Sequence, residues 1–328
     1  MKKALIVLLV VCLSIALVAP VAMAKGTNIK IAHVVNEKDA FHVCALKFKE
    51  IVEEKTDGEV TVTIFPNAKL GDERALLEGM KMGVVDAGII TSGPIINFIP
   101  EFGVFDLPFL FRSPSHAYAV LDGPVGKTLL GKMEDQGWKG LAYGERGFRN
   151  LTNSKNAVKT PADVEGLKIR LMQNPIYVKT FKTLGANAVP MAWTEALTAL
   201  QQRTIDGQEN PLNVIVAFKL YESQEYLSLT RHAYAPNVVM MGMRSWEKLT
   251  SEQQEVVQEA AQLAAEANRK YDNDKAAEWL AFLKDQGMNV VEDPDLAAFR
   301  DAVQPVYDEY GSQFGEDLLE AIAETKAE

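Results

Sequence analysis

The stretch VTVTIFPNAKLGDERALLEGMKMGVVD, residues 60–86, passes from alternating apolar and polar residues to apolar residues at helical spacing. This order predicts a strand over residues 60–65, then a loop, a helix and the start of a second strand. Its pattern LLxxM followed by VD (residues 76–86) recurs as ALxxL followed by ID (residues 196–206), with identical spacing. Two copies of one unit indicate two lobes of similar build, although so short a match also fits chance.

Outward from this stretch, strand and helix patterns alternate along nearly the whole chain, which favours parallel α/β sheets. Residues 29–34 alternate as a strand, and residues 40–55 carry apolar side chains at helical spacing. Thr250 and Gln253 form a capping box that opens a helix expected to run to Asp285. The predicted fold class is α/β.

The N-terminus has the composition of a secretory signal. Lys2 and Lys3 precede an apolar run over residues 4–18, and Ala22-Met23-Ala24 gives the small-x-small pattern of a cleavage site. We expect cleavage after Ala24, because the run is too short for a retained membrane anchor. The rest of the chain is long enough for about two domains.

Charge, cysteine content and missing motifs argue against several classes. The formal net charge of −10 argues against a nucleic-acid partner, because phosphate binding needs clustered cations. Cys44 is the one cysteine beyond the signal, and its helical spacing with Phe41 and Phe48 predicts a buried, inert thiol. Hydrolase, zinc and phosphate-loop motifs are absent, which lowers but does not remove the expectation of an enzyme.

The repeated unit places candidate site residues. Ligands of open α/β sheets bind at the carboxyl ends of the strands. Glu73 and Trp193 stand just before the two matching helices, and Thr91 and Asn210 follow the two matching second strands. Among the four histidines, only His33 is near a predicted strand end. A cleft between facing lobes would contain residues from both units.

Three side chains have donors suited to an anion. Arg170 closes the strand-like GLKIR, and its planar guanidinium fits a carboxylate; an internal salt bridge or a surface position is equally open. Arg149 follows another predicted strand, as a second anion donor or as a solvated residue. Asn210 precedes a proline, so its amide either contacts a ligand or stabilises a turn.

Five motifs, in order, give the chain a resemblance: FPNAxLG (65–71), DLPF (106–109), GLKIR (166–170), GAN (185–187) and DGQENP (206–211). With them the chain resembles the periplasmic solute-binding proteins of tripartite ATP-independent periplasmic (TRAP) transporters, the C4-dicarboxylate-binding, DctP-like family. The resemblance covers essentially the whole chain after the signal.

The resemblance implies roles for the candidate residues. Arg170 would clamp the ligand carboxylate, with Asn210 and Arg149 supporting the same group. Trp193 would pack on the ligand, and Glu73 would accept from its hydroxyls or amines. A hydroxylated or larger acid is favoured over succinate, because Glu73 would repel a second carboxylate.

At position 91 some sialic-acid-binding relatives carry an acidic residue, whereas this chain has Thr91. That departure argues against sialic acid. A uronate or other sugar acid, a short dicarboxylate and an aromatic acid stay open.

The resemblance also implies a fold of the periplasmic-binding-protein type II-like class, with a hinge, connecting strands and a long helix spanning both lobes. Residues 1–24 would be the signal. Residues 25–147 and 237–276 would form lobe I, and residues 148–236 and 277–328 lobe II. Strand crossovers would fall near 146–149 and 235–237.

The implied function is a monomeric periplasmic protein without cofactor or metal. It would close around an organic acid and deliver it to integral membrane permease subunits. The alternatives are a ligand-binding component of a sensory system and a periplasmic enzyme acting on organic acids.

Overall fold

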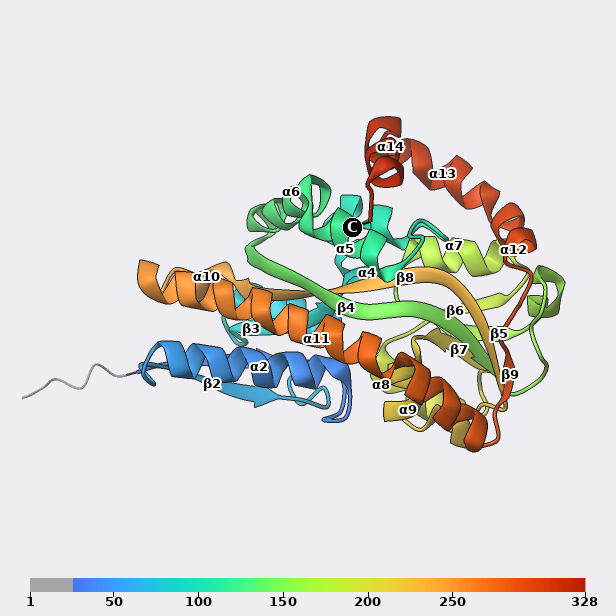
Figure 1. Cartoon of the computed structure of the whole chain (residues 1–328), viewed down its shortest axis with the longest axis horizontal. Coiled ribbons are helices and arrows are strands. Elements are labelled where there is room, and N and C mark those ends of the chain that lie inside the picture. Colours follow the sequence, from blue (N-terminus) through green and yellow to red (C-terminus); the bar gives the residue numbers. More distant parts are fainter. Residues whose placement is uncertain (1–25, 328) are drawn as a thin grey trace, which may run out of the picture.

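The computed structural model describes residues 26–327, and these form two α/β halves around one mixed sheet (Figure 1). The sheet order is β2-β1-β3-β8-β4-β7-β5-β6, with β9 added alongside β8. The expected signal segment and its cleavage site lie outside the described residues. The α/β fold class is confirmed.

The first half is built on three parallel strands, β1 (Thr27–Ala32), β2 (Val60–Phe65) and β3 (Ala87–Thr91). Helix α2 (Ala40–Lys55) and helix α3 (Glu73–Met82) connect them. Asp72 caps α3 by accepting from the N–H of Ala75 at 2.8 Å, and Gly83 ends it in the left-handed conformation. Helix α2 and strand β2 have the predicted bounds.

The second half repeats this plan with β5 (Lys168–Leu171), β6 (Asn187–Pro190) and β7 (Gly207–Asn210), also parallel. Helices α7 (Pro175–Thr183) and α8 (Trp193–Gln201) connect them.

The two aspartates that end the repeated sequence pattern play the same part in both halves. Lys30 N–H donates to Asp86 Oδ2, and Lys168 N–H donates to Asp206 Oδ2, each at 2.9 Å. Each bond fixes the central strand of a half to the turn before its third strand. The predicted duplication is therefore present in the structure, and Lys30 corresponds to Lys168.

Two long antiparallel strands connect the halves: β4 (Trp138–Asn153) and β8 (Tyr226–Gly242). Residues 237–241 of β8 pair with β3, whereas residues 150–153 of β4 pair with β7. The crossing between halves therefore lies where it was predicted. Gly147, with φ of 103°, sits at a register shift of β4 in a backbone conformation that side chains disfavour.

Helix α11 (Ser251–Asp285) runs past both halves, as expected (Figure 1). Thr250 and Gln253 form the predicted capping box at its start. The helix packs against α2 of the first half and against α9 (Leu212–Ala217) of the second. It is the long helix that spans both lobes.

The remaining elements are short. They are α4 (Ser92–Ile95), α5 (Pro114–Asp122), α6 (Pro124–Lys132), α10 (Met243–Trp246), β9 (Asn289–Val291), α12 (Leu296–Ala302), α13 (Gln304–Phe314) and α14 (Glu316–Glu324), with four 3-10 turns at Pro100–Asp106, Glu134–Gln136, Pro161–Val164 and Leu220–Glu222. The C-terminal segment ends against α5, where His116 Nε2 contacts the carbonyl oxygen of Ile322 at 2.9 Å.

The core is apolar in both halves, and Cys44 lies fully buried within it. Burial raises the pKa of the Cys44 thiol to about 12, so the thiolate is disfavoured and the prediction of an inert cysteine holds. Of the helices within residues 26–327, none combines the length and the apolar character needed to span a bilayer.

Candidate ligand-binding site

A small cavity lies where the carboxyl ends of the two sets of parallel strands face each other. The first half contributes Val34, Glu73 and Pro94 to its lining, and the second contributes Arg170, Met191 and Trp193, together with neighbouring residues of both. Strand ends, and the helix N-termini that follow them, are where such sheets bind ligands. The cavity is therefore the candidate site.

Arg170 lies within β5 and is 3 % exposed. Its Nε and Nη2 donate to the carbonyl oxygen of Met191 at 3.0 and 2.7 Å. No carboxylate of residues 26–327 forms a salt bridge with it. Burial lowers the pKa of Arg170 to about 10, with Arg149 adding to the effect while Glu209 and Glu73 oppose it. The site therefore contains a buried cation without a counterion in contact.

Arg149, in β4, is 1 % exposed and is paired with Glu209 of β7. Its Nε and Nη2 donate to the two carboxylate oxygens, and Nη2 also donates to the Glu209 carbonyl oxygen at 2.6 Å. Burial would raise the pKa of Glu209, but Arg149 and then His232 hold it at about 2. Only Nη1 of Arg149 makes no hydrogen bond within the described part of the chain.

Glu73 is the first residue of α3, and its Oε1 accepts from the N–H of Thr91 at 2.7 Å. Thr91 ends β3 and is buried. Burial raises the pKa of the Glu73 carboxyl, while Thr91, Arg146 and Arg170 each oppose that rise. Glu73 and Thr91 thus form one hydrogen-bonded unit at the edge of the first half.

Trp193 and Asn210 lie on the second half, at the N-terminus of α8 and the end of β7. The Trp193 ring stands 5.4 Å from the Arg170 guanidinium carbon, and its buried Nε1 has no partner among residues 26–327. Asn210 Nδ2 donates to Gln208 Oε1 at 2.5 Å. Trp193 and Arg170 therefore lie side by side in the cavity lining.

His33 lies just beyond β1 and is fully buried. Its Nε2 contacts Nδ1 of His42 at 3.1 Å, and its Nδ1 has no partner within the described residues. The adjacent Val34 lines the cavity instead. His33 therefore does not line the cavity, and neither do Thr91, Arg149 and Asn210.

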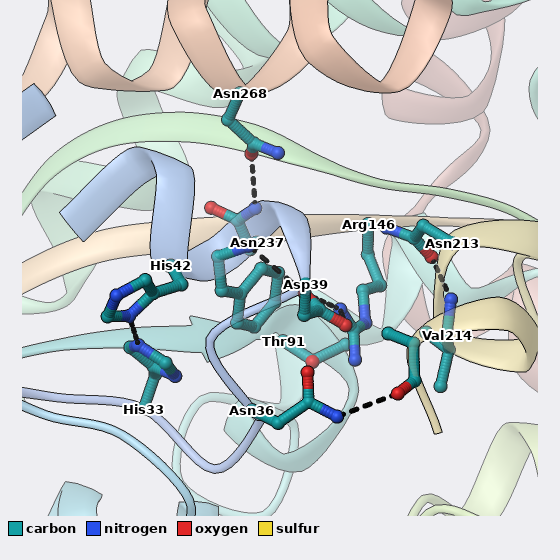
Figure 2. Close-up of polar contacts among 12 residues, drawn as sticks. His33, Asn36, Asp39, His42, Thr91, Arg146, Asn213, Val214, Asn237 and Asn268 are labelled. Carbon is teal, nitrogen blue, oxygen red and sulfur yellow. Dashed lines mark hydrogen bonds and ion pairs between the residues drawn. The ribbon is translucent and has the colours of Figure 1, made fainter. Parts of the chain in front are cut away.

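Arg146 is a charged group that the motif-based reasoning left out of the site. It lies three residues before Arg149 on the crossing strand, and its Nη1 donates to both oxygens of Asp39 at 2.7 and 2.8 Å (Figure 2). The sequence feature that could have pointed to Arg146 is its spacing from Arg149: both arginines lie on the predicted crossover, three residues apart. In the structure each is directed to a different half.

The two halves touch across the cleft. Asn36, in the loop after β1, donates from Nδ2 to the carbonyl oxygen of Ala217 in α9 at 2.9 Å. Asn97 Nδ2 donates to the Gln173 carbonyl oxygen at 2.8 Å. The structure therefore holds the lobes in contact rather than apart.

Two lobes joined by crossing strands, with a buried guanidinium between them, define a two-lobed binding protein. Residues 31–313 match the model of the family described as "Bacterial extracellular solute-binding protein, family 7" (DctP). The chain belongs to this family, which is one of solute-binding proteins and not of enzymes.

A similar protein with a named ligand agrees with the assignment. The chain is 37 % identical over 302 residues to the 2,3-diketo-L-gulonate-binding periplasmic protein of Escherichia coli, covering 91 % of this chain and 92 % of that protein.

Solved structures agree as well. A TRAP periplasmic solute-binding protein of Polaromonas sp. JS666, bound to D-erythronate, is 42 % identical with a TM-score of 0.90, over 92 % of this chain and all of that one (100 %). The sugar-acid-binding protein of Advenella mimigardefordensis, in complex with galactonate, is 36 % identical with a TM-score of 0.89, over 92 % and 98 %.

Proposed function

We propose that this protein is the periplasmic binding subunit of a TRAP transporter, which captures a small organic acid by lobe closure and delivers it to membrane permease subunits. The observation that carries the proposal is Arg170. A buried guanidinium whose hydrogen bonds, within residues 26–327, go only to a carbonyl oxygen is costly, and a ligand carboxylate would offset that cost.

The other candidate residues take supporting roles in this proposal. Arg149, held by Glu209, directs its remaining Nη1 donor to the ligand carboxylate, and Asn210 supports the same carboxylate. Trp193 covers the ligand body, and Glu73 with Thr91 accepts from ligand hydroxyls. His33 supports the wall from behind, through its contact with His42.

The ligands of similar proteins support an acid as the cargo. Three similar proteins bind acids that each combine one carboxylate with hydroxyl groups: D-erythronate, galactonate and 2,3-diketo-L-gulonate. Glu73, facing the cleft beside Arg170, suits such a ligand better than a dicarboxylate, because two like charges repel.

The remaining details belong to the same proposal. The chain is cleaved after Ala24 and acts as a monomer in the periplasm. Residues 25–147 and 237–276 move as lobe I against residues 148–236 and 277–328 as lobe II. The ligand contacts both lobes only in the closed form, which shifts the population towards closure. The ligand is released unchanged, and mass spectrometry showing its conversion would contradict this.

The direct test is Arg170→Ala. We expect binding of an acid that the wild type binds to weaken by about 2–5 kcal/mol, because a buried carboxylate loses its charged partner. Isothermal titration calorimetry measures this loss. Lys168→Ala is the matched control, since Lys168 lies on the same strand with an exposed side chain. Equal affinity of the Arg170 variant and the wild type would remove Arg170 from the site.

A further inference from the structure

The crossing strand β4 carries a second buried guanidinium, which faces the first half of the molecule. Arg146 is 5 % exposed, its guanidinium carbon lies 4.3 Å from the centre of the Phe41 ring, and its Nη1 is bound to Asp39. Its Nε and Nη2 make no hydrogen bond to any side chain or backbone group of residues 26–327. Nη1 therefore fixes the Arg146 guanidinium to Asp39, while Nε and Nη2 remain available as donors.

The neighbours of Arg146 place it at the ligand-binding edge of that half. Asp39 caps the start of α2, the helix that follows β1, and Thr91 ends β3. Figure 2 shows the Arg146 guanidinium beside Asp39, with Thr91 close by in the view. Arg146 and Arg170 both act on the Glu73 carboxyl, opposing the rise in its pKa caused by burial. Glu73 is thus within electrostatic reach of both arginines.

Arg170 and Arg146 differ in whether a neighbouring carboxylate neutralises their positive charge. Arg170 has a carbonyl oxygen as its partner, so the positive charge is uncompensated there. Arg146 and Asp39 form a pair whose charges cancel, and the pair leaves Nε and Nη2 of Arg146 as donors, whereas the Asp39 carboxylate is fully buried. A hydroxyl oxygen can accept from these donors without adding charge, so it suits such a pair. A second carboxylate would instead meet Asp39 and Glu73.

We propose that the Arg146–Asp39 pair is a distal subsite that binds hydroxyl groups, and that it selects a polyhydroxylated monocarboxylate over a dicarboxylate of equal length. This inference rests on the proposed function, because it takes Arg170 as the anchor of the single acid group.

Three six-carbon acids test the inference on the mature, full-length protein. Galactonate has one carboxylate and a hydroxylated chain, galactarate carries a second carboxylate at the far end, and hexanoate lacks the hydroxyls. We expect the wild type to bind galactonate at least about tenfold more tightly than either of the others, because one or two charge-assisted hydrogen bonds differ.

Arg146→Gln separates the subsite from the anchor. Calorimetry should show galactonate affinity falling by about 10- to 100-fold, with hexanoate affinity changing by less than about threefold. Arg170→Ala should instead weaken all three acids. Arg231→Gln is the control, because Arg231 is an exposed arginine of β8 that stacks on Phe148.

Removing Arg146 alone leaves Asp39 buried without its partner and could unfold the protein. The double variant Asp39→Asn/Arg146→Gln removes both charges and keeps a side chain able to cap α2. Melting temperatures identify folded variants, and the double variant should lose the same preference for galactonate.

The outcomes separate the two proposals. If the wild type binds none of the three acids, the proposed function fails and this inference falls with it. If the wild type prefers galactarate, or if Arg146→Gln weakens all three acids equally, the acid-binding function stands and the distal subsite is wrong.

Discussion

Two arginines three residues apart on β4 serve opposite halves of the molecule. Arg146 pairs with Asp39 at the start of α2, and Arg149 pairs with Glu209 in β7. All four side chains are buried. The crossing strand is therefore joined to each lobe by its own ion pair, and a short segment around Gly147 separates the two attachments.

The halves share a frame but carry different side chains at the end of the central strand. Because Lys30 and Lys168 make the same bond to their aspartates, Ala32 of β1 corresponds to Arg170 of β5. The first half thus has a methyl group where the second has a guanidinium. The duplicated backbone places the strand ends opposite each other, and Arg170, the proposed anchor of the anion, is present in the second half alone.

The largest expected effect comes from breaking the ion pair of the second half. Glu209→Gln should lower the free energy of unfolding by about 3–5 kcal/mol, because Arg149 would be left buried without its counterion. In the wild type the pKa of Glu209 is depressed to about 2. Its contribution is therefore complete above the unfolded pKa near 4.5 and is lost as the pH falls towards about 2. Urea unfolding at several pH values measures both effects.

Asp122→Asn supplies the comparison for that variant. Asp122 pairs with Arg269 but is 56 % exposed, so its loss should cost less than about 1 kcal/mol. Similar losses in the two variants would mean that burial does not set the strength of the Arg149 pair.

Local patterns predicted much of this frame. The alternation at 60–65, the apolar spacing at 40–55 and the capping box at Thr250 each depend on neighbours in sequence, and all three elements have the expected bounds. The repeated aspartates predicted the duplication because their role is to close a local turn between two adjacent strands.

The charge partners could not be predicted in the same way. Arg149 could be identified as a candidate, but its pairing with Glu209 depends on the β4–β7 register, which joins residues 60 positions apart. Arg146 and Asp39 are separated by 107 positions. With 44 acidic residues in the chain, composition alone does not identify which carboxylate meets which guanidinium.

A second way to sharpen the comparison uses His33, which corresponds to Leu171 of the other half. Burial, followed by the neighbouring His42, lowers the pKa of His33 to about 3. The folded state therefore binds fewer protons than the unfolded state between about pH 3 and 6.5, and stability is lost as the pH falls through this window. His33→Leu, which imports the residue of the second half, should remove this loss, worth about 2 kcal/mol between about pH 7.5 and 5.

The measurement must compare two proteins at each pH, because another group acts in the opposite direction. Burial raises the pKa of Glu145 to about 7, so that carboxyl contributes stability at low pH which is lost as the pH rises. The difference between wild type and His33→Leu isolates the histidine. An unchanged pH dependence would mean that His33 takes up a proton in the folded protein without cost.

The smallest expected effect concerns contact between the lobes. Asn36 in the first half donates to the Ala217 carbonyl oxygen in the second, and under the proposed closing motion this bond would be broken in the open form. Asn36→Ala should therefore weaken ligand binding by about 1 kcal/mol, roughly a fivefold loss, seen mainly as faster ligand dissociation. Stopped-flow displacement of a bound acid would measure the dissociation rate.

Asn28→Ala is the matched control, because Asn28 donates to Thr61 and Thr63 within the first half alone. Loss of a bond inside one lobe weakens the open and closed forms equally, so it should leave the dissociation rate unchanged. Only a bond between lobes favours closure over opening. If both variants release ligand at the wild-type rate, the contact at Asn36 does not hold the closed form, and the free energy of closure comes from the ligand and from the groups that bind it.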